Sequence, residues 1–350
     1  MPRAPRLLCV TDLWIGTYPV AGAGTPTGLG EGVWRVRLDD ASGALSGARQ
    51  VAELPSPSFL AARGAVLYAA LEDAPGAVAT LAVRADGGLD EVRREPSGGD
   101  YPCHLAAAVP GVLLAANYGT GTLGVLRAEG AGEPGLAPAV FGHSGSGPRG
   151  DRQEGPHAHF VVPTPDGRHV LVVDLGTDEL RRYRVTSTGL QAAGIAATLP
   201  PGTGPRHLEF SSDGRLLYLV GELDLRVHVL TWDAASATGR LVQSVPAVVP
   251  EPAPGCGWLP SHLALAGDDV LVAVRGADVL TRWRIGADGL LAAGRSAPLG
   301  GHWPRHFAVV GPWVVVALER GHELVVLDED DRTVARLPLP SPTCVLPVAR

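Results

Sequence analysis

The sequence predicts an all-β fold: a seven-bladed β-propeller of four-stranded antiparallel blades, closed by a blade shared between the N- and C-termini. Three observations predict it. A proline-led apolar strand recurs seven times, further strand patterns follow each copy at a constant phase, and the N-terminus supplies the strands that the last copy lacks. We therefore expect one propeller domain over residues 1–350.

The recurring strand opens each repeat. Its copies begin 38 to 55 residues apart, at Pro57, Pro102, Pro156, Pro205, Pro260, Pro304 and Pro342. The third copy, Pro156-His157-Ala158-His159-Phe160, carries one extra residue. Seven copies of one unit favour a propeller over a β-sandwich or two separate β domains.

Each repeat continues with three more strand patterns. A turn, which contains Asp-Gly at 166–167 and 213–214, precedes second apolar runs at 66–71, 112–116, 170–173, 216–220, 270–274 and 313–318. A third run alternates, as in 226–230, which is typical of a half-buried strand. A fourth run often follows Gly-Leu, as at 189–190 and 289–290. Four strands per 40 to 50 residues fit one propeller blade.

The last repeat has only one strand before the chain ends. Residues 7–15, 33–38 and 45–54 match the second, third and fourth strands of a repeat. A blade built from both termini closes the ring without a free sheet edge.

A polar residue ends the second strand of six repeats: Glu72, Asn117, Asp174, Glu222, Arg275 and Glu319. It follows the repeat proline by 15 residues in four repeats, and by 17 and 18 in the other two. The start of one antiparallel strand lies beside the end of its neighbour. We therefore expect these residues and the Pro-x-His segments to converge at one mouth of the central channel.

The repeats differ in the charge that they place there. His104 and His262 are predicted to link neighbouring blades, whereas Arg206 and Arg305 put a charge where apolar sequence begins. With Arg275 they face Asp174, Glu222 and Glu319. These six residues form either an ion-pair network or an anion site with its own charge balance.

The segment 153–159 is the most unusual. His157 and His159, at positions i and i+2, point to one side of a strand. We rank a general base above metal ligation, since no third histidine or cysteine is near in sequence, and we expect neither metal nor cofactor. The glycine-rich segment 142–149 before it either folds over the channel mouth or is a flexible surface loop. Trp258 and Trp303, each before a repeat proline, are candidates for lining the mouth.

Composition excludes several function classes. All 29 basic residues are arginine, so lysine Schiff-base chemistry is excluded and guanidinium groups supply every fixed positive charge. A formal net charge of −7 argues against nucleic-acid binding. No apolar stretch is long enough to span a bilayer, and residues 1–10 are no secretory signal, so we expect a cytoplasmic protein. Cys9, Cys103, Cys256 and Cys344 form no CxxC pair and are expected to be free buried thiols.

These residues resemble the lactonase-type seven-bladed propellers, a family that includes bacterial 6-phosphogluconolactonases and fungal carboxy-cis,cis-muconate cyclases. The resemblance covers nearly the whole chain. Its motifs lie at 15–18, 116–121, 143–147, 153–159, 174–178, 202–207 with Glu222, and 304–306.

The resemblance implies an active site made by a histidine of the His157/His159 pair with Arg206, Glu222 and Arg275. The chain departs from the family pattern at Ser56, at Val274, and at Glu319, where glutamine is common. A carboxylate at position 319 would repel a phosphate unless an arginine pairs with it.

The leading hypothesis is hydrolysis of a sugar lactone, with 6-phosphogluconolactone as a candidate. His157 or His159 is the expected base, Glu222 orients it or shares its role, and Arg206 stabilises the oxyanion. Arg275 and Arg305 are expected to hold a carboxylate or phosphate. The further substrate-binding candidates are His306, His207, Gln153, Asn117, Asp174 and Glu319.

Two alternatives stay open. One is cycloisomerisation of a carboxylated muconate, which would use the same arginines for several carboxylates. The other is a non-enzymatic binding platform. For the enzymatic hypotheses, the expected partner is a small anionic lactone, without nucleic acid or membrane, bound by a monomer or weak homo-oligomer.

Overall fold

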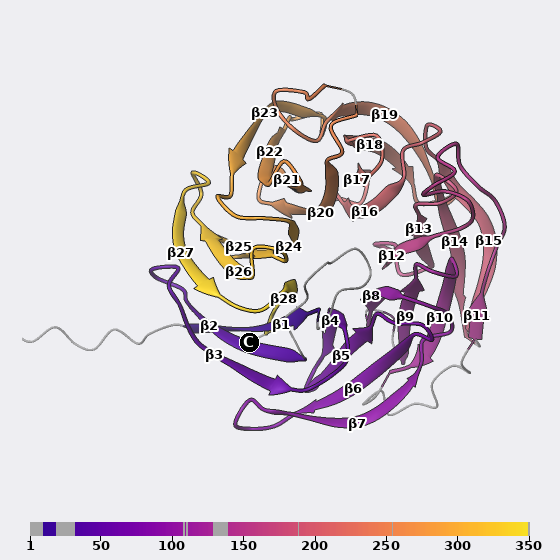
Figure 1. Ribbon diagram of the computed structural model, residues 1–350. Coiled ribbons are helices and arrows are strands. Elements are labelled where there is room, and N and C mark those ends of the chain that lie inside the picture. The colour runs from indigo at the N-terminus through magenta and orange to yellow at the C-terminus, as the bar shows by residue number, and fades with distance from the viewer. Residues whose placement is uncertain are drawn as a thin grey trace, which may run out of the picture.

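The computed structural model describes residues 10–18, 32–107, 109, 111–128, 139–187, 189–253 and 255–348. In these residues the chain forms 28 strands and no helix. The strands make seven four-stranded antiparallel sheets arranged as blades around a central axis (Figure 1). The predicted seven-bladed β-propeller is therefore confirmed.

We number the blades along the chain and give each from its innermost strand outward. Blade 1 holds β28 (Pro342–Pro347), β1 (Val10–Thr17), β2 (Val33–Asp39) and β3 (Leu45–Ala52). Blade 2 holds β4 (Pro57–Arg63), β5 (Val66–Leu71), β6 (Ala77–Val83) and β7 (Leu89–Pro96). Blade 3 holds β8 (Pro102–Ala106), β9 (Val112–Asn117), β10 (Thr122–Arg127) and β11 (Ala139–Phe141). Blade 4 holds β12 (Ala158–Pro163), β13 (His169–Asp174), β14 (Glu179–Thr186) and β15 (Gly189–Thr198).

The remaining three blades follow the same order. Blade 5 holds β16 (Pro205–Phe210), β17 (Leu216–Gly221), β18 (Arg226–Asp233) and β19 (Thr238–Pro246). Blade 6 holds β20 (Leu259–Ala266), β21 (Asp269–Arg275), β22 (Val279–Ile285) and β23 (Leu291–Pro298). Blade 7 holds β24 (Pro304–Val310), β25 (Trp313–Leu318), β26 (Glu323–Leu327) and β27 (Thr333–Pro338).

Blade 1 closes the ring as predicted. The C-terminal strand β28 pairs with the N-terminal strand β1, with Trp14 opposite Leu346 and Ile15 opposite Val345. The innermost strands then contact one another in an unbroken cycle from β4 to β28. The expectations for residues 7–9, including the Cys9 thiol, lie outside the described residues.

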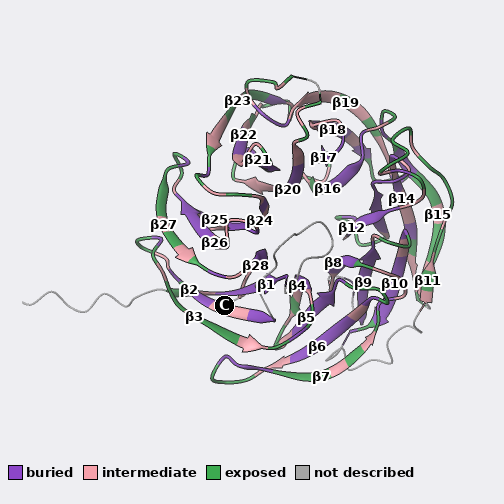
Figure 2. Cartoon of the chain, viewed as in Figure 1, coloured by how far each residue is buried: buried purple, intermediate pink, exposed green. Residues whose placement is uncertain are grey.

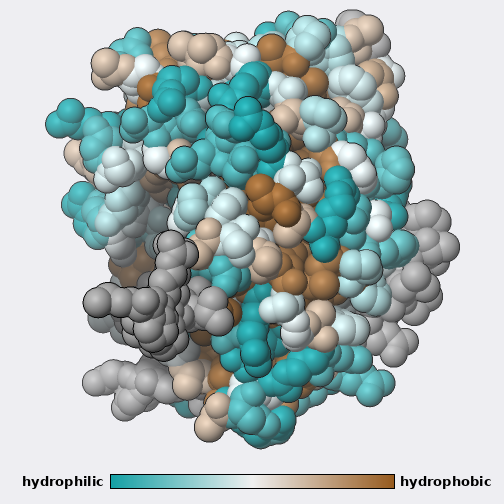
Figure 3. Space-filling model, turned by 90° about the vertical axis from the view of Figure 1, so that its left-hand side faces the viewer, coloured by the Kyte–Doolittle hydropathy of each residue, from teal (hydrophilic) through white to brown (hydrophobic). Residues whose placement is uncertain are grey.

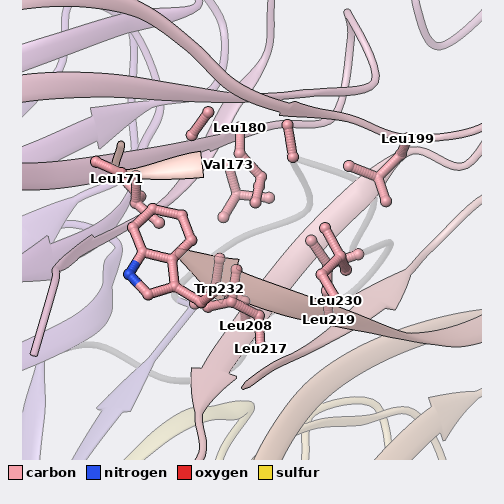
Figure 4. Close-up of a cluster of buried hydrophobic side chains, with 12 residues drawn as sticks. Leu171, Val173, Leu180, Leu199, Leu208, Leu217, Leu219, Leu230 and Trp232 are labelled. Carbon is pink, nitrogen blue, oxygen red and sulfur yellow. The ribbon is translucent and has the colours of Figure 1, made fainter. Parts of the chain in front are cut away.

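The core lies between the blades. Seven clusters of buried side chains each join two consecutive blades; Figure 4 shows the one between blades 4 and 5, around Leu171, Leu208 and Trp232. Both faces of each second strand are therefore covered, which explains their continuous apolar sequence. In β25, Val315 packs toward blade 1 and Val316 toward blade 6.

Burial decreases outward along each blade. The first and second strands are largely buried, whereas the outermost strands carry most of the exposed residues (Figure 2). From the side, the rim is mainly hydrophilic, with small hydrophobic patches interspersed (Figure 3). Among the described residues, no helix is long and apolar enough to cross a membrane.

Candidate active site

A cavity of about 520 Å³ opens at the mouth where first strands begin and second strands end. It is lined by Glu72, Tyr101, Cys103, Tyr118, Arg152, His159, Arg206, Glu222, Leu259, Arg275, Trp303, Arg305 and Arg320. The strand register places it there, since Pro57 pairs with Leu71 and Pro304 with Leu318. The convergence expected from the repeat phase is therefore present for Glu72, Glu222 and Arg275.

A one-residue bulge recurs where the innermost strand enters five blades. In each of these blades one residue of the innermost strand has no partner on the second strand. These residues are Ser58, Cys103, His159, Arg206 and Arg305, in blades 2, 3, 4, 5 and 7. All five of these side chains line the cavity or a smaller space next to it. A bulge re-aims a side chain, and here it delivers one side chain per blade to the channel.

The same register distinguishes the two histidines of the 153–159 segment. His159 is the bulge residue of blade 4 and lines the cavity, whereas His157 precedes β12 and does not line it. Phe160, directly after His159, occupies the place that His207 and His306 hold in their blades. The extra residue of the third repeat therefore lies before this pair.

Glu222 is the centre of a buried ion cluster. Its side chain is 4% exposed and accepts hydrogen bonds from Arg275 Nη2 at 2.5 Å and Arg152 Nη2 at 2.6 Å. Arg206 Nε lies 2.9 Å from Glu222 Oε2, as an ion pair without hydrogen-bond geometry. One carboxylate thus gathers three guanidinium groups from two blades and the 142–157 segment.

Electrostatics keeps this cluster charged at neutral pH. Burial alone would raise the pKa of Glu222, but the charges of Arg275, Arg206 and Arg152 outweigh it and lower that pKa. Burial and the neighbouring Arg275 lower the pKa of Arg206 to about 9, although Glu222 opposes the shift. Glu222 is therefore a poor proton acceptor and serves as a counter-charge.

Arg305 is held by acceptors from three blades. It lies 3.2 Å from Glu319, 3.4 Å from Glu72, and donates to the Tyr18 hydroxyl at 2.7 Å. Burial would lower the pKa of Arg305, but Tyr18, Glu319 and Glu72 raise it. Arg305 was expected to hold a substrate anion. Such an anion would have to compete with Glu319 and Glu72, which already contact the guanidinium group.

Trp303 forms the blade 7 side of the cavity. Its indole lies 3.5 Å from the Arg320 guanidinium carbon and 5.5 Å from that of Arg275. Its backbone has a φ of 66°, which is uncommon for a bulky residue. Asp278 fixes this conformation by accepting a hydrogen bond from the Trp303 N–H at 2.8 Å. Strained residues held by their surroundings cluster at functional sites.

Among the described residues that line this cavity, His159 is the one histidine. It is 7% exposed, its Nδ1 has no hydrogen-bond partner, and its ring lies edge-on to Tyr118 at 5.7 Å. Burial, followed by the charge of Arg206, lowers its pKa well below 6.5, while Glu222 acts in the opposite direction. His159 is therefore neutral at pH 7 and able to accept a proton.

His157 has different surroundings. Its ring stacks on Tyr118 at 4.5 Å, its Nδ1 lies 2.8 Å from the Tyr118 carbonyl oxygen, and its Nε2 lies 3.1 Å from Glu154. Both ring nitrogens are engaged. Tyr118 in turn contacts Arg152 through its hydroxyl at 3.5 Å. His157 thus supports the wall of the cavity.

Six aromatic rings form a closed ring beneath the cavity: Phe59, His104, Phe160, His207, His262 and His306. Neighbouring centroids are 3.9–5.6 Å apart. His207 Nε2 accepts from Arg206, so its Nδ1–H donates to His262 Nδ1 at 2.8 Å. Burial lowers the pKa of His306 to about 3, so this member of the aromatic ring is uncharged at neutral pH.

His104 and His306 also link blades. Each Nδ1 accepts a hydrogen bond from the next blade, His104 from Val161 N–H and His306 from Val345 N–H, both at 3.3 Å. The blade-linking prediction for His104 is confirmed. His306 and His207, expected to bind substrate, line only the smaller space next to the main cavity.

Three of the residues expected to bind substrate, Asn117, Gln153 and Asp174, do not line the cavity. Asn117 donates to Ser97 and Thr122, and Gln153 donates to Leu175 and Asp178. Asp174 caps the turn after β13 by accepting from the N–H groups of His157, Gly176 and Thr177. These side chains are fully buried and stabilise the loops that carry His159 and Arg152.

The three arginines expected to face Asp174, Glu222 and Glu319 have other partners in part. Arg206 and Arg275 pair with Glu222, and Arg305 pairs with Glu319 and Glu72, so the expectation that they face Asp174 is wrong.

Sequence reasoning missed Arg152, Tyr118 and Arg320. Each directly neighbours a residue that it did single out: Gln153, Asn117 and Glu319. Of the two tryptophans proposed for the mouth, Trp303 lines the cavity and Trp258 does not. The 142–157 segment reaches the cavity through Arg152, and its Arg149 donates to the Leu223 carbonyl of blade 5. Within the described residues, no three His, Cys, Asp or Glu side chains are arranged to hold a metal ion.

Comparison with known proteins shows that the chain is similar to seven-bladed propellers of the lactonase family. A sequence model for the family described as "Lactonase, 7-bladed beta-propeller" matches residues 12–347. The 6-phosphogluconolactonase of Bacillus subtilis (strain 168) is 30% identical over 348 residues, which cover 95% of this chain and 97% of that protein.

Solved structures agree in fold. The periplasmic gluconolactonase of Pseudomonas aeruginosa superimposes with a TM-score of 0.84 and 28% identity, covering 97% of this chain and 99% of that one. A protein from Lactobacillus plantarum superimposes with a TM-score of 0.87 at 24% identity, covering 97% and 100%, which shows the fold alone.

Proposed function

The chain belongs to the lactonase family of seven-bladed β-propellers, and on this premise we propose that it hydrolyses a sugar lactone in the cavity around His159 and Glu222. One observation supports this proposal most. A neutral, buried imidazole and a carboxylate-bound arginine cluster line the same cavity. Lactone opening needs these two functions, a base for water and positive charge for the oxyanion.

The proposed reaction begins with the attack of a water molecule on the lactone. The water oxygen bonds to the lactone carbonyl carbon while His159 accepts a proton from that water. The carbonyl oxygen becomes an oxyanion, which the guanidinium groups of Arg206 and Arg275 stabilise. The tetrahedral carbon then expels the ring oxygen, which takes the proton from the His159 imidazolium. The product is an open-chain hydroxy acid.

Glu222 assists without transferring a proton. By holding Arg275 and Arg206 it fixes the donors before the charge develops, so little reorganisation accompanies the reaction. Its negative charge also favours the protonated form of His159. This interaction opposes, in part, the effect of burial and of Arg206 on imidazolium formation.

His159 is preferred over His157 as the base because of their contacts. His159 lines the cavity, and its Nδ1 has no hydrogen-bond partner. Both nitrogens of His157 contact acceptors outside the cavity. Of the other candidates, Arg206 keeps its expected role at the oxyanion. In this proposal Arg275 joins it there instead of holding a substrate anion, and Glu222 holds the arginines instead of orienting the base or sharing its role. Gln153, Asn117 and Asp174 support the loops.

The test is proton release from a panel of lactones at controlled pH, with the spontaneous rate subtracted. We expect the native protein to accelerate opening, and His159→Asn to lose about 100-fold to 10,000-fold of that rate. His169→Asn, at the start of β13 and so at the end of blade 4 away from the cavity, is the matched control and keeps it. A native rate equal to the spontaneous one would overturn the proposal. Turnover of a carboxylated muconate instead would support cycloisomerisation.

A further inference from the structure

A second cavity lies between blades 4 and 5, at the end of the propeller away from the candidate active site. It measures about 290 Å³, and His169, Arg182, Arg184, Gln191, Ala193 and Ser236 are among the residues that line it. His169 begins β13, whereas the active-site mouth lies where the second strands end. The proposed reaction gives this cavity no role.

Strand pairing places three of its polar side chains in one row. His169 of β13 is opposite Arg184 of β14, and Arg184 is opposite Gln191 of β15. Arg182, two residues before Arg184, lies on the same face of the sheet. That face packs against blade 5, because Leu171, opposite Arg182, belongs to the core cluster between blades 4 and 5. The polar row therefore continues this core to the end of the two blades.

Blade 6 repeats the arrangement with one exchange. Asp269 begins β21 and is opposite Arg284, and Arg282 is opposite Leu271. Both arginines of blade 4 thus have a counterpart in blade 6, and aspartate takes the place of histidine. The propeller therefore contains its own comparison for the blade 4 cavity.

Carboxylates neutralise the arginines of blade 6. Asp269 lies 3.0 Å from Arg282 Nη1 and 3.1 Å from Arg284 Nε. Asp331, on the turn between β26 and β27 of the following blade, lies 2.6 Å from Arg282 Nη2 and 2.9 Å from Arg295 Nη2. Two aspartates of the chain itself thus bind the planar N–H edges of these guanidinium groups.

The arginines of blade 4 have backbone partners instead. Arg182 Nε donates to the Ala193 carbonyl at 2.7 Å, and its Nη1 donates to the carbonyls of Ser236 and Ala237, on the turn between β18 and β19 of the following blade. Within residues 139–187 and 189–253 and the other described ranges, no carboxylate is within ion-pair distance of Arg182 or Arg184. The positions of the two blade 6 carboxylates are therefore held by an imidazole and by backbone carbonyls.

His169 adds a polar atom without a partner. Its Nδ1 is buried and makes no hydrogen bond to the described part of the chain. Burial lowers the pKa of His169; Asp166 opposes this shift, and Arg182 and Arg184 add to it. Asp166 itself pairs with Arg168 at 2.7 Å. The imidazole is therefore neutral at pH 7, with two guanidinium charges beside it.

We propose that this cavity is a second binding site, which takes a small organic dianion. Arg182 and Arg184 hold its anionic groups, and His169 Nδ1 shares a hydrogen bond with it. The ligand supplies from outside the charge that Asp269 and Asp331 supply within blades 6 and 7. The volume is at the lower limit of small-molecule sites, roughly 300 Å³, so the ligand is small.

Calorimetry tests the site with malonate, inorganic phosphate and acetate at matched ionic strength. We expect a dianion to bind the native protein more tightly than acetate does. Tighter binding of malonate than of phosphate supports a dicarboxylate as the ligand, and the reverse order supports a phosphate ester. Equal binding of acetate and both dianions, or no binding of either dianion, would overturn the proposal.

Arg184→Met locates the site on the molecule. It should weaken dianion binding by about 10-fold to 100-fold, the effect of one charge-assisted hydrogen bond. Arg284→Met is the matched control, because it makes the same change at the equivalent position of blade 6, where Asp269 already provides a carboxylate. It should leave the affinity unchanged. Native-like affinity in Arg184→Met would contradict the proposal.

Two variants of His169 test the comparison between the blades. His169→Asp rebuilds the carboxylate that blade 6 carries at this position and should abolish dianion binding. His169→Asn has nearly the same shape without the charge and should keep most of the binding. If the two variants bind dianions equally well, the electrostatic basis of the site is refuted.

These measurements are independent of lactone hydrolysis, since they use no lactone. Dianions that bind the arginines of the active site give a component that Arg184→Met and His169→Asp retain. Both variants should also open lactones at the native rate, because neither residue lines the active-site cavity. Loss of dianion binding with an unchanged rate therefore assigns the site to the cavity between blades 4 and 5.

Discussion

Replacing Glu222 with glutamine tests the electrostatic core of the site. The substitution keeps the shape of the side chain and removes the one negative charge shared by Arg152, Arg206 and Arg275. Three guanidinium groups then face one another in a region where Glu222 is 4% exposed and Arg206 is 3% exposed. We expect this repulsion to lower the free energy of unfolding and to displace the arginines.

The magnitude follows from the burial of the cluster. Removing one partner of a buried ion pair costs about 3–5 kcal/mol. An unfolding entropy of about 2 cal/mol/K per residue gives roughly 0.7 kcal/mol/K for a chain of 350 residues. We therefore expect Glu222→Gln to lower the Tm by about 4–7 °C. The control Glu323→Gln removes a partly exposed partner of Arg336 and should lower the Tm by only about 1 °C.

The assay is thermal unfolding of both proteins across pH. The pKa of Glu222 is lower in the folded state than in the unfolded state, where the pKa of a glutamate is about 4.3. Its contribution is therefore present above about pH 4.3 and is lost as pH falls toward the folded-state pKa. The Tm difference between native protein and Glu222→Gln should narrow below that pH. Added phosphate should restore part of the loss at pH 7, because an anion replaces the missing charge.

Two results would refute this reasoning. A Tm within about 1 °C of the native value at pH 7 would mean that the guanidinium groups do not depend on Glu222. A Tm difference that persists unchanged into acid would assign the loss to packing, since glutamine and protonated glutamate carry the same charge.

Three further predictions use other groups. The pKa of His159 is lowered by burial and Arg206, so kcat/KM for lactone opening should stay constant as pH falls through 6.5; an acid limb with an apparent pKa near 6.5 would contradict this. His157→Asn should lower the Tm, because it removes the stack on Tyr118, and should lower kcat less than His159→Asn does; the reverse ranking in paired melting and proton-release assays would refute the assignment of the base. Burial raises the pKa of the Cys344 thiol to about 12, so mass spectrometry after iodoacetamide treatment at pH 8 should find it unlabelled in folded protein and labelled in urea; native labelling would count against the closed blade 1.

Much of the fold could be predicted because it depends on local patterns. The repeat proline and the apolar run that follows it recur through the chain, and the expected second strands in blades 2 to 7 agree with the observed ones to within one residue at each end. The shared blade followed from the same counting. For the site, the repeat phase placed Arg206, Glu222 and Arg275 at one mouth, because antiparallel pairing brings the start of one strand beside the end of the next.

The choice between His157 and His159 needed the strand register. Both histidines share one tripeptide, and an i, i+2 pattern places them on the same side of a regular strand. The bulge at Ala158 and Phe160 breaks that regularity and sends His159 alone into the cavity. The aromatic residue after His159 was the available signal, since an aromatic side chain also follows Arg206 and Arg305.

The sequence by itself determined the number of blades, their closure and the end of the channel that carries charge. Only the tertiary structure decided which charges neutralise one another. Arg305 meets Tyr18 287 residues away and Glu72 233 residues away, and Arg152 meets Glu222 70 residues away. Such partners are set by the angle at which blades close around the axis and by side-chain direction at each bulge. That geometry, which no local pattern records, gathers three guanidinium groups around Glu222 and stacks Arg320 on Trp303.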